Sequence, residues 1–227
     1  MPLTIIVPVL NEAGALPALC QRLARLPGAE IIVADGGSND GSREWLDQWQ
    51  DGELKRVTGC TTGRAEQMNA AAQVARGQLL LFLHADTQLP ERAIFELDKL
   101  HGAPLWGRFD VAFDDPSPVM RVIAWFISKR SRLTGIATGD QAMFVSRDLF
   151  ERVGGFDELP IMEDIALSKK LKQFSPPICL LSKVVTSARR WRQNGIVKTV
   201  LLMWGMRLAF FLGVPARRLA HFYRVVR

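Results

Sequence analysis

Two hydrophobic patterns alternate along the first hundred residues. Short apolar runs are typical of buried strands, and between them lie longer stretches in which apolar residues recur every three or four positions, as in amphipathic helices. The runs cover residues 3–9, 30–34 and 78–83, and the stretches cover residues 16–26, 42–50 and 64–76. This strand–helix alternation predicts an α/β fold, in which a mostly parallel sheet carries helices on both faces.

The alternation weakens after residue 101. Strands are predicted near residues 108–113 and 141–145, with a helix near 119–132 between them, and a β-branched run follows at 178–186. We expect this part to add α+β elements to the same sheet.

The last 36 residues, 192–227, form an apolar and basic extension. Within its long apolar stretch only Lys198 and Arg207 are charged, and their spacing of nine residues places them on opposite faces of a helix. A helix that simply spans a bilayer is therefore not favoured. Two packed or interfacial helices, broken near Gly213 and Pro215, are predicted instead.

Charge is distributed very unevenly along the chain. The overall net charge is +6, but all 23 acidic residues lie in residues 1–164, where 16 basic residues leave a net charge of −7. Residues 165–227 contain 13 basic residues and no acid. This polarity predicts an anionic partner for the C-terminal part, such as phospholipid head groups, nucleic acid or a phosphorylated substrate.

The N-terminal region and the cysteines favour a cytoplasmic protein. The first apolar run lacks a preceding basic region and is interrupted by Pro8 and Asn11, so it is typical of a strand and not of a secretory signal. The three cysteines, Cys20, Cys60 and Cys179, are far apart and form no CxxC pair, so neither a disulfide framework nor a zinc site is indicated.

Polar side chains follow three of the predicted strands. Asn11 and Glu12 come after the first strand, Asp35 ends the second, and Asp86 follows the run at 78–83. Turn formation explains Asp35 taken alone, and helix capping explains Asp86 taken alone. Because parallel strands end at one edge of a sheet, where ligands bind, the three together favour a binding site.

Asp86 is the strongest candidate for a metal ligand. It comes directly after a strongly apolar run, so we expect it to be buried, and a buried bare charge is costly. A divalent cation that also binds phosphate oxygens would offset this cost, and oxygen ligands suit Mg²⁺ or Mn²⁺. The sequence lacks GxGxxG and P-loop motifs, and no Ser-His-Asp or Cys-His arrangement has motif support.

An ordered series of motifs resembles the family 2 glycosyltransferases of GT-A fold over residues 3–191. The segments are TIIVPVLNE, VADGGSNDGS, GRAEQMNAA, LLFLHADT, GDQAMFVSRDLFERVGGFDE, MEDIALSKKLK and RRW. The combination is most similar to a bacterial subgroup, the rSAM/selenodomain-associated transferase 2 proteins. The resemblance implies a GT-A domain over residues 1–191, with a nucleotide-binding half at 1–100 and an acceptor half at 101–191, followed by a helical extension at 192–227.

The resemblance also implies a donor site in the first half. Asp35 matches an acid that holds the uridine of the donor, although Gly36 stands where the family has a second acid. Asp86 matches the metal-bearing acid, and His84 stands where the family has the other acid of that motif. The residues implied in nucleotide-sugar binding are Pro8, Glu12, Asp35, Arg64 and Asp86, with Mn²⁺ or Mg²⁺ on Asp86.

In the second half the resemblance implies the catalytic groups. Asp164 matches the general base, and Glu163 is its neighbour. Asp140, Arg190 and Trp191 match residues on the acceptor side. The implied reaction is an inverting, metal-dependent transfer of a sugar, expected from a UDP-sugar, to an acceptor that the sequence does not identify and that is compatible with a lipid-linked molecule.

Two other functions are alternatives to this reaction. A sugar nucleotidyltransferase would be expected to carry a glycine-rich triphosphate loop after the first strand, and VPVLNEAG contains none. A catalytically inactive, membrane-docked nucleotide-sugar-binding protein is the other alternative. We expect residues 192–227 to hold the enzyme on the cytoplasmic face of an anionic membrane without crossing it, through Arg217, Arg218, Arg224 and Arg227 and the aromatic anchors Trp204, Phe210, Phe211 and Phe222. Packing of the same helix on the domain, or a dimer interface, is the alternative. No nucleic acid partner is expected, and an oligomer is compatible with the sequence.

Overall fold

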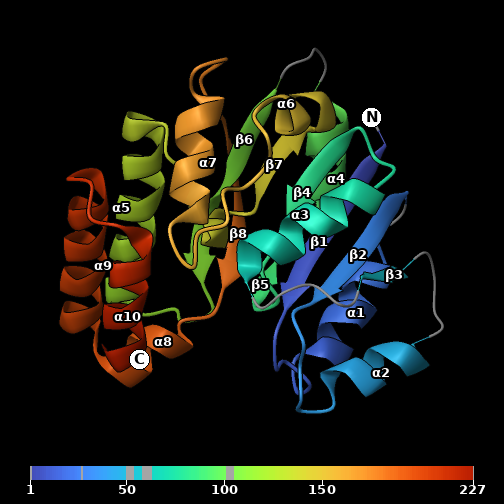
Figure 1. The fold of residues 1–227 in the computed structure, drawn as a ribbon, viewed down its shortest axis with the longest axis horizontal. Coiled ribbons are helices and arrows are strands. Elements are labelled where there is room, and N and C mark those ends of the chain that lie inside the picture. Colours follow the sequence, from blue (N-terminus) through green and yellow to red (C-terminus); the bar gives the residue numbers. More distant parts are fainter. Residues whose placement is uncertain (1, 27, 50–53, 58–62, 101–104, 227) are drawn as a thin grey trace.

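The computed structural model describes residues 2–26, 28–49, 54–57, 63–100 and 105–226, so Cys60 lies outside the described residues. Within these ranges the chain forms one sheet flanked by helices (Figure 1). The strands are β1 (Leu3–Val9), β2 (Ala29–Asp35), β3 (Leu54–Val57), β4 (Leu79–Phe82), β5 (Thr87–Gln88), β6 (Trp106–Phe113), β7 (Met143–Ser146) and β8 (Ile178–Thr186). The helices are α1 (Leu16–Ala24), α2 (Ser42–Gln48), α3 (Arg64–Val74), α4 (Ala93–Asp98), α5 (Pro118–Thr134), α6 (Arg147–Arg152), α7 (Glu163–Leu171), α8 (Arg189–Asn194), α9 (Ile196–Phe211), α10 (Ala216–Val226) and the short 3₁₀ helix η1 (Gly139–Gln141).

The sheet has the strand order β3-β2-β1-β4-β7-β6-β8-β5. The first four strands in this order are parallel, as the strand–helix alternation predicts. β7 runs antiparallel to both of its neighbours, β6 and β8 are parallel, and the short edge strand β5 is antiparallel. The predicted fold class is confirmed, whereas β3 and β5 were not predicted.

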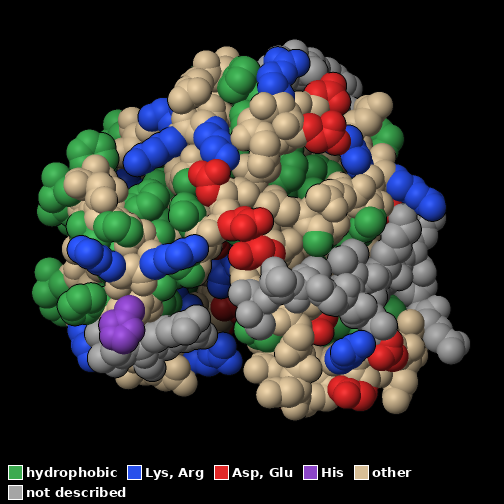
Figure 2. Space-filling model, in the orientation of Figure 1, with side chains coloured by type: hydrophobic (Ala, Val, Ile, Leu, Met, Phe, Trp, Pro, Cys, Tyr) green, Lys and Arg blue, Asp and Glu red, His purple; other side chains and the backbone are tan. Residues whose placement is uncertain are grey.

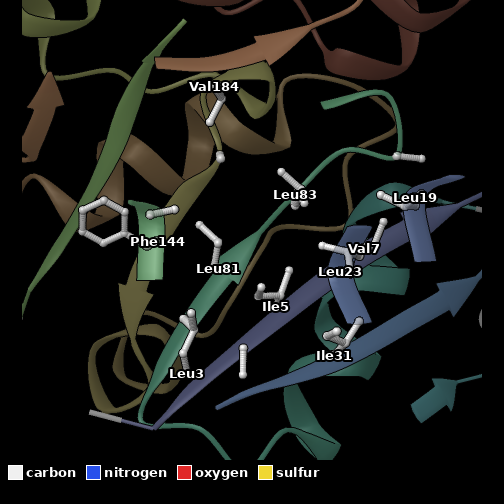
Figure 3. Packing of buried hydrophobic residues seen from close by; sticks show 14 of the residues in the cluster. Leu3, Ile5, Val7, Leu19, Leu23, Ile31, Leu81, Leu83, Phe144 and Val184 are labelled. Carbon is white, nitrogen blue, oxygen red and sulfur yellow. The ribbon is translucent and has the colours of Figure 1, made fainter. Parts of the chain in front are cut away.

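Helices cover both faces of the sheet. Since alternate residues of a strand point to opposite faces, each central strand contributes side chains to both layers of the core. On one face, Ile5 and Val7 of β1 pack with α1, α2, α4 and α5, and Figure 3 shows them beside Leu19 and Leu23 of α1. On the other face, Ile6 packs with residues of α3, α6 and α7. This double coverage explains why the central strands are continuous apolar runs.

The C-terminal extension begins with the last residues of α8 and continues as the two predicted helices, α9 and α10, with the break between Phe211 and Ala216. They pack on α7 through a small cluster that includes Ile165, Met206 and Leu219. Figure 1 shows α5, α9 and α10 together at the end of the molecule opposite α1 and α2. Among the described residues, no helix has both the length and the apolar character that crossing a membrane requires.

A buried charge network joins β6 to α5. Arg108 is completely buried and forms an ion pair with Asp110, which also accepts a hydrogen bond of 2.7 Å from Arg132. The Arg108 guanidinium donates further bonds to the Ser131 hydroxyl at 3.0 Å and the Ser128 carbonyl at 2.9 Å. Since a buried charge is tolerated only when it is paired and hydrogen-bonded, Asp110 is essential to this arrangement.

We therefore predict that Asp110→Ala lowers the free energy of unfolding by about 3–5 kcal/mol, because it leaves the Arg108 charge buried and unpaired. The measurement is denaturant unfolding at pH 7. Asp157→Ala is the control: Asp157 also forms an ion pair, with Lys170, but its side chain is 44% exposed, and its loss should cost less than about 1 kcal/mol. Equal losses in the two variants would contradict the role of Asp110.

Candidate active site

The loops after β1 and β2 are joined at the carboxyl edge of the sheet. The Asn11 amide donates to the Ser38 hydroxyl at 2.9 Å, and the Asn11 side chain accepts a bond from the Asn39 amide at 2.9 Å. The Asp40 carboxylate accepts from the Ala13 amide at 3.0 Å and, through its other oxygen, from the Ser42 hydroxyl at 2.5 Å. These bonds hold two strand ends side by side and place their polar residues on one edge.

Three predicted donor residues lie on these two strands and the loop after β1. Pro8 is buried within β1, opposite Ala34 of β2. Glu12 is half-buried, and its amide donates to the Ser42 hydroxyl at 3.0 Å. Asp35 is only 2% exposed, and its carboxylate accepts bonds from the Ser38 hydroxyl at 2.5 Å and the Gly37 amide at 3.3 Å.

Gln67 of α3 explains the glycine that follows Asp35. The Gln67 side-chain amide donates to the Val9 carbonyl at 2.6 Å and the Ala34 carbonyl at 2.8 Å, so it joins the ends of β1 and β2. A Cβ atom at Gly36 would lie 2.8 Å from the Gln67 nitrogen. An acidic side chain at position 36 would therefore displace this bridge.

Asp86 lies just beyond β4, on the edge that it shares with Asp35, but the expectation that it is buried is wrong. The side chain is exposed, and it accepts a hydrogen bond of 3.4 Å from the Thr87 hydroxyl. Leu83, Ala85 and Thr87 are buried around it, whereas the Asp86 carboxylate itself faces solvent. Among the described residues, no group of three or more His, Cys, Asp and Glu side chains is placed to hold a metal ion.

His84, Gly139 and Asp164 meet although they come from three distant segments. The Gly139 amide donates to the Asp164 carboxylate at 2.8 Å. On its other side Gly139 packs so tightly on the His84 ring that a Cβ atom would lie 2.3 Å from Nε2. Burial and the charges of Arg64 and Arg190 hold the pKa of His84 well below its usual value, so the imidazole is neutral.

Glu163 and Asp164 begin α7 in a poorly solvated environment. Burial and the adjacent Asp164 raise the pKa of Glu163 to about 6, although Arg64, whose guanidinium lies 3.4 Å away, opposes the rise. Burial also raises the pKa of Asp164, against the hydrogen bonds from the Gly139 and Ile165 amides and the charge of Arg207. The contact between Arg64 and Glu163 brings a predicted donor residue to the predicted catalytic pair.

Backbone strain concentrates around the same edge. Asn11, Ala142 and Met162 have φ values of 56°, 46° and 67°, and they are the non-glycine residues with positive φ among the described ones. Asn11 follows β1, Ala142 follows Asp140, and Met162 precedes Glu163. Such strain is typical of functional sites, where packing imposes a conformation that the residue would not otherwise adopt.

The predicted acceptor-side residues differ in their exposure and in their contacts. Asp140 lies in η1, and its buried Oδ1 accepts no hydrogen bond from the described residues. Arg190 is exposed on α8 and packs over the Tyr223 ring at 5.5 Å, while its charge affects His84. Trp191 is half-buried against Phe113, with the ring centroids 5.7 Å apart.

Two arginines that the motifs did not indicate also face this site. Burial lowers the pKa of Arg130 on α5 to about 10; Arg207 on α9 also lowers it, and Asp140 and Asp164 raise it. In the sequence, Arg207 stands out as a charge within an apolar stretch, a feature that argues against a membrane-spanning helix but does not by itself indicate a site. Arg130 lies among other basic residues of α5, so nothing in its sequence context distinguishes it.

A sequence model of glycosyl transferase family 2 matches residues 4–153, more than half of the chain. The chain belongs to glycosyl transferase family 2. This match ends before α7, so it covers the strand ends with Asp35 and Asp86 and does not include Glu163 and Asp164. It does not distinguish the rSAM/selenodomain-associated subgroup from others, so that part of the resemblance stays a prediction.

Two relatives illustrate the breadth of the family. The chain is 32% identical over 100 residues to the undecaprenyl-phosphate 4-deoxy-4-formamido-L-arabinose transferase of Aeromonas hydrophila, covering 40% of this chain and 31% of that protein. It is 24% identical over 188 residues to the beta-monoglucosyldiacylglycerol synthase of Synechocystis, covering 74% and 39%. The chain thus spans about a third of the length of these relatives.

Solved structures support the GT-A-like fold. The mannosyltransferase PcManGT of Pyrobaculum calidifontis, in complex with GDP-Man and Mn²⁺, matches with a TM-score of 0.63 at 21% identity, over 91% of this chain and 64% of that one. S. aureus TarS residues 1–349 match with a TM-score of 0.62 at 17% identity, over 83% and 61%.

The raised pKa of Glu163 generates a prediction about stability. Because the carboxyl group holds its proton more tightly in the folded state, stability falls as the pH rises from about 4.5 to about 6. Glu163→Gln should therefore raise the free energy of unfolding at pH 7, by roughly 1–2 kcal/mol, and have little effect at pH 4. Denaturant unfolding at both values measures this, with the exposed Glu151→Gln as control. An equal gain at pH 4 would contradict the assignment.

Proposed function

We propose that the chain is an inverting glycosyltransferase that moves a sugar from a nucleotide-sugar, expected to be a UDP-sugar, to a hydroxyl group of an acceptor. The observation that carries the proposal is the poorly solvated pair Glu163–Asp164, held against Arg64 at the edge where β1, β2 and β4 end. In open α/β sheets that edge binds ligands, and acids with raised pKa values are typical of catalytic sites.

Asp164 is the general base of the proposed reaction. It accepts the proton of the acceptor hydroxyl while that oxygen bonds to the anomeric carbon, and the bond from this carbon to the nucleoside diphosphate breaks on the opposite side. The raised pKa makes Asp164 a stronger base than an exposed aspartate. The Gly139 amide holds one carboxylate oxygen at 2.8 Å and the Ile165 amide holds the other at 2.7 Å, so the carboxylate is fixed in position, and each oxygen keeps a further lone pair for the acceptor proton.

Arg64 and Asp86 serve the departing diphosphate. The half-exposed Arg64 guanidinium donates to phosphate oxygens, for which its planar geometry is suited. Asp86 is the residue that would hold Mn²⁺ or Mg²⁺. Its exposed carboxylate fits an ion that keeps several waters and binds one protein carboxylate together with substrate phosphates. When bound, such an ion neutralises the negative charge that develops on the leaving group.

The nucleoside part of the donor is assigned to the joined loops after β1 and β2. Pro8 and Asp35 form the floor of this region, and Glu12 lies at its side. Gln67 occupies the space beside Gly36, where the family has a second acid. The contact that this acid would make with the nucleobase is therefore assigned to neighbouring groups. Asp140, Arg190 and Trp191 remain assigned to the acceptor side.

Family membership favours sugar transfer over nucleotide-sugar synthesis, since the matched model is that of a glycosyl transferase family. An inactive binding protein would share the fold and the donor site, so only an activity assay distinguishes it from a transferase. Incubation with a panel of nucleotide-sugars and Mn²⁺ should release nucleoside diphosphate. Binding without any release from the unmodified chain would favour the inactive alternative, and pyrophosphate made from a nucleoside triphosphate and a sugar phosphate would favour a nucleotidyltransferase.

Two variants test the roles of general base and metal ligand separately. Asp164→Asn should lower turnover by a factor on the order of 10² to 10⁴ and keep Mn²⁺-dependent affinity for UDP, because the amide keeps the shape but not the basicity. Asp86→Ala should lose the Mn²⁺-dependent part of that affinity, as measured by calorimetry with and without the ion. Asp157→Asn, at an exposed site, is the control. Undiminished turnover in Asp164→Asn would move the base to Glu163 or Asp140.

We further propose that the chain binds peripherally to the cytoplasmic face of an anionic membrane. On α9 the exposed apolar residues Leu201, Trp204, Leu208 and Phe211 recur every three or four positions and form one stripe. Figure 2 shows hydrophobic and basic side chains mixed at the end of the molecule formed by α5, α9 and α10. Such a mixture suits an interface of lipid and anionic head groups.

Helix α5 adds to this surface in a way that the sequence did not indicate. Its residues Val122, Trp125 and Phe126 are each more than half exposed. Among the aromatic residues of the extension, Trp204, Phe211 and Phe222 are exposed, whereas Phe210 is partly buried in the cluster with α7. Among its basic residues, Arg217 and Arg218 are exposed, and the side chains of Arg224 and Arg227 lie outside the described part.

Flotation with vesicles of phosphatidylcholine and phosphatidylglycerol tests the membrane proposal. We expect the full chain to float at low salt and less at high salt, because each basic group near the leaflet contributes only about 1 kcal/mol. The double substitution Trp204→Ser and Phe211→Ser should abolish flotation. Phe95→Ser is the control, since Phe95 is 60% exposed but lies on α4. A chain that stays unbound at low salt would favour self-association of this surface instead.

A further inference from the structure

Arg130 and Arg207 form a pair of poorly satisfied cations beside the proposed base. The Nε atoms of both are buried and have no hydrogen-bond partner among the described residues. The other nitrogens of Arg130 reach only the Ile136 carbonyl and the Thr138 hydroxyl, each at 3.5 Å. Buried donors are normally satisfied, so two such guanidiniums in one place indicate a missing acceptor.

Neighbouring carboxylates do not supply that acceptor. Asp140 and Asp164 are close enough to raise the pKa of Arg130, and Arg207 lowers that of Asp164. Yet neither arginine forms an ion pair with an acid in the described part of the chain. The buried Oδ1 of Asp140 is also without a partner. The four charged groups thus face one another without direct contact.

We propose that Arg130 and Arg207 bind a phosphate group of the acceptor, next to the oxygen that receives the sugar. The guanidinium is suited to phosphate, because its N–H groups match two oxygens at once. This subsite rests on the proposed transfer at Asp164, since it is the position of the pair beside that base that assigns the phosphate to the acceptor. Arg64, which contacts Glu163, is the arginine assigned to the donor diphosphate.

The surroundings indicate that this acceptor is amphiphilic. Arg130 comes four residues after Phe126 on α5, and Arg207 comes three residues after Trp204 on α9, so each arginine lies on a helix face adjoining an exposed aromatic residue. A charged head held by the two arginines therefore has apolar surface beside it on both helices. The class of ligand is a phosphate monoester or diester with a hydrocarbon chain.

Octyl phosphate below its micellar concentration is the probe, octanol is its uncharged counterpart, and UDP with Mn²⁺ represents the donor. Calorimetry should show that the unmodified chain binds octyl phosphate more tightly than octanol. Arg207→Gln and Arg130→Gln should each weaken octyl phosphate binding by about 10- to 100-fold, as expected for lost charge-assisted hydrogen bonds, and leave UDP affinity unchanged. Lys198→Gln removes an exposed charge from the same helix and should change octyl phosphate binding less than about twofold.

Three outcomes would overturn the subsite: no preference for octyl phosphate over octanol in the unmodified chain, the same octyl phosphate affinity in the folded arginine variants as in Lys198→Gln, or weakened UDP binding with octyl phosphate unaffected. The last result would assign the pair to the donor diphosphate. Thermal unfolding identifies folded variants. Binding of octyl phosphate through Arg207 by a chain that transfers no sugar would refute the proposed function and leave the subsite standing.

Discussion

The hydrogen bond from the Gly139 amide to Asp164 is the contact on which the arrangement of the site depends. It can form only because residue 139 has no side chain, since the His84 ring occupies the space where a Cβ atom would lie. The three residues follow β4, precede β7 and begin α7, so one crowded contact aligns segments that are far apart in the sequence. It also explains the histidine in place of the family's acid. At position 84 a packed, neutral ring supports Gly139, whereas a carboxylate there would add a further negative charge to the poorly solvated pair Glu163 and Asp164.

Conformational cost is concentrated at this edge and is compensated by the rest of the fold. Two adjacent acids are poorly solvated, and residues of three different loops adopt positive φ at a cost of about 1–3 kcal/mol each. The strands beneath them are buried on both faces by large apolar clusters, which stabilise the fold enough to hold these loops in place. Poor solvation is also what raises the pKa of Asp164, so the feature that destabilises the folded state is the one that suits this carboxylate to the proposed role of general base.

Local patterns predicted much of the fold and less of the site. The central strands were predictable because each is an uninterrupted apolar run, and their common edge followed from parallel pairing. β3 was not, since its sequence LKRV has no such run. The burial of Asp86 was predicted wrongly because which side chain of a loop faces solvent depends on contacts beyond its sequence neighbours. Likewise Gln67 lies 31 positions after Gly36, and Arg130 and Arg207 come near each other only because α5 and α9 lie at the same end of the folded chain (Figure 1), a relation that no periodicity encodes.

Helix α9 connects the proposed membrane surface to the proposed chemistry. Lys198 and its apolar stripe face outward, whereas Met206 packs on α7 and the Arg207 Nε is buried. A helix surrounded by lipid could not bury Arg207 beside Asp164, and a helix buried on all sides could not expose Trp204. Lying in the interface satisfies both faces at once. In that position the α9 surface rests on the head groups, so an amphiphilic acceptor would reach Arg207 by moving along the membrane plane and would not have to leave the bilayer. Membrane contact would then orient the acceptor as well as retain the enzyme.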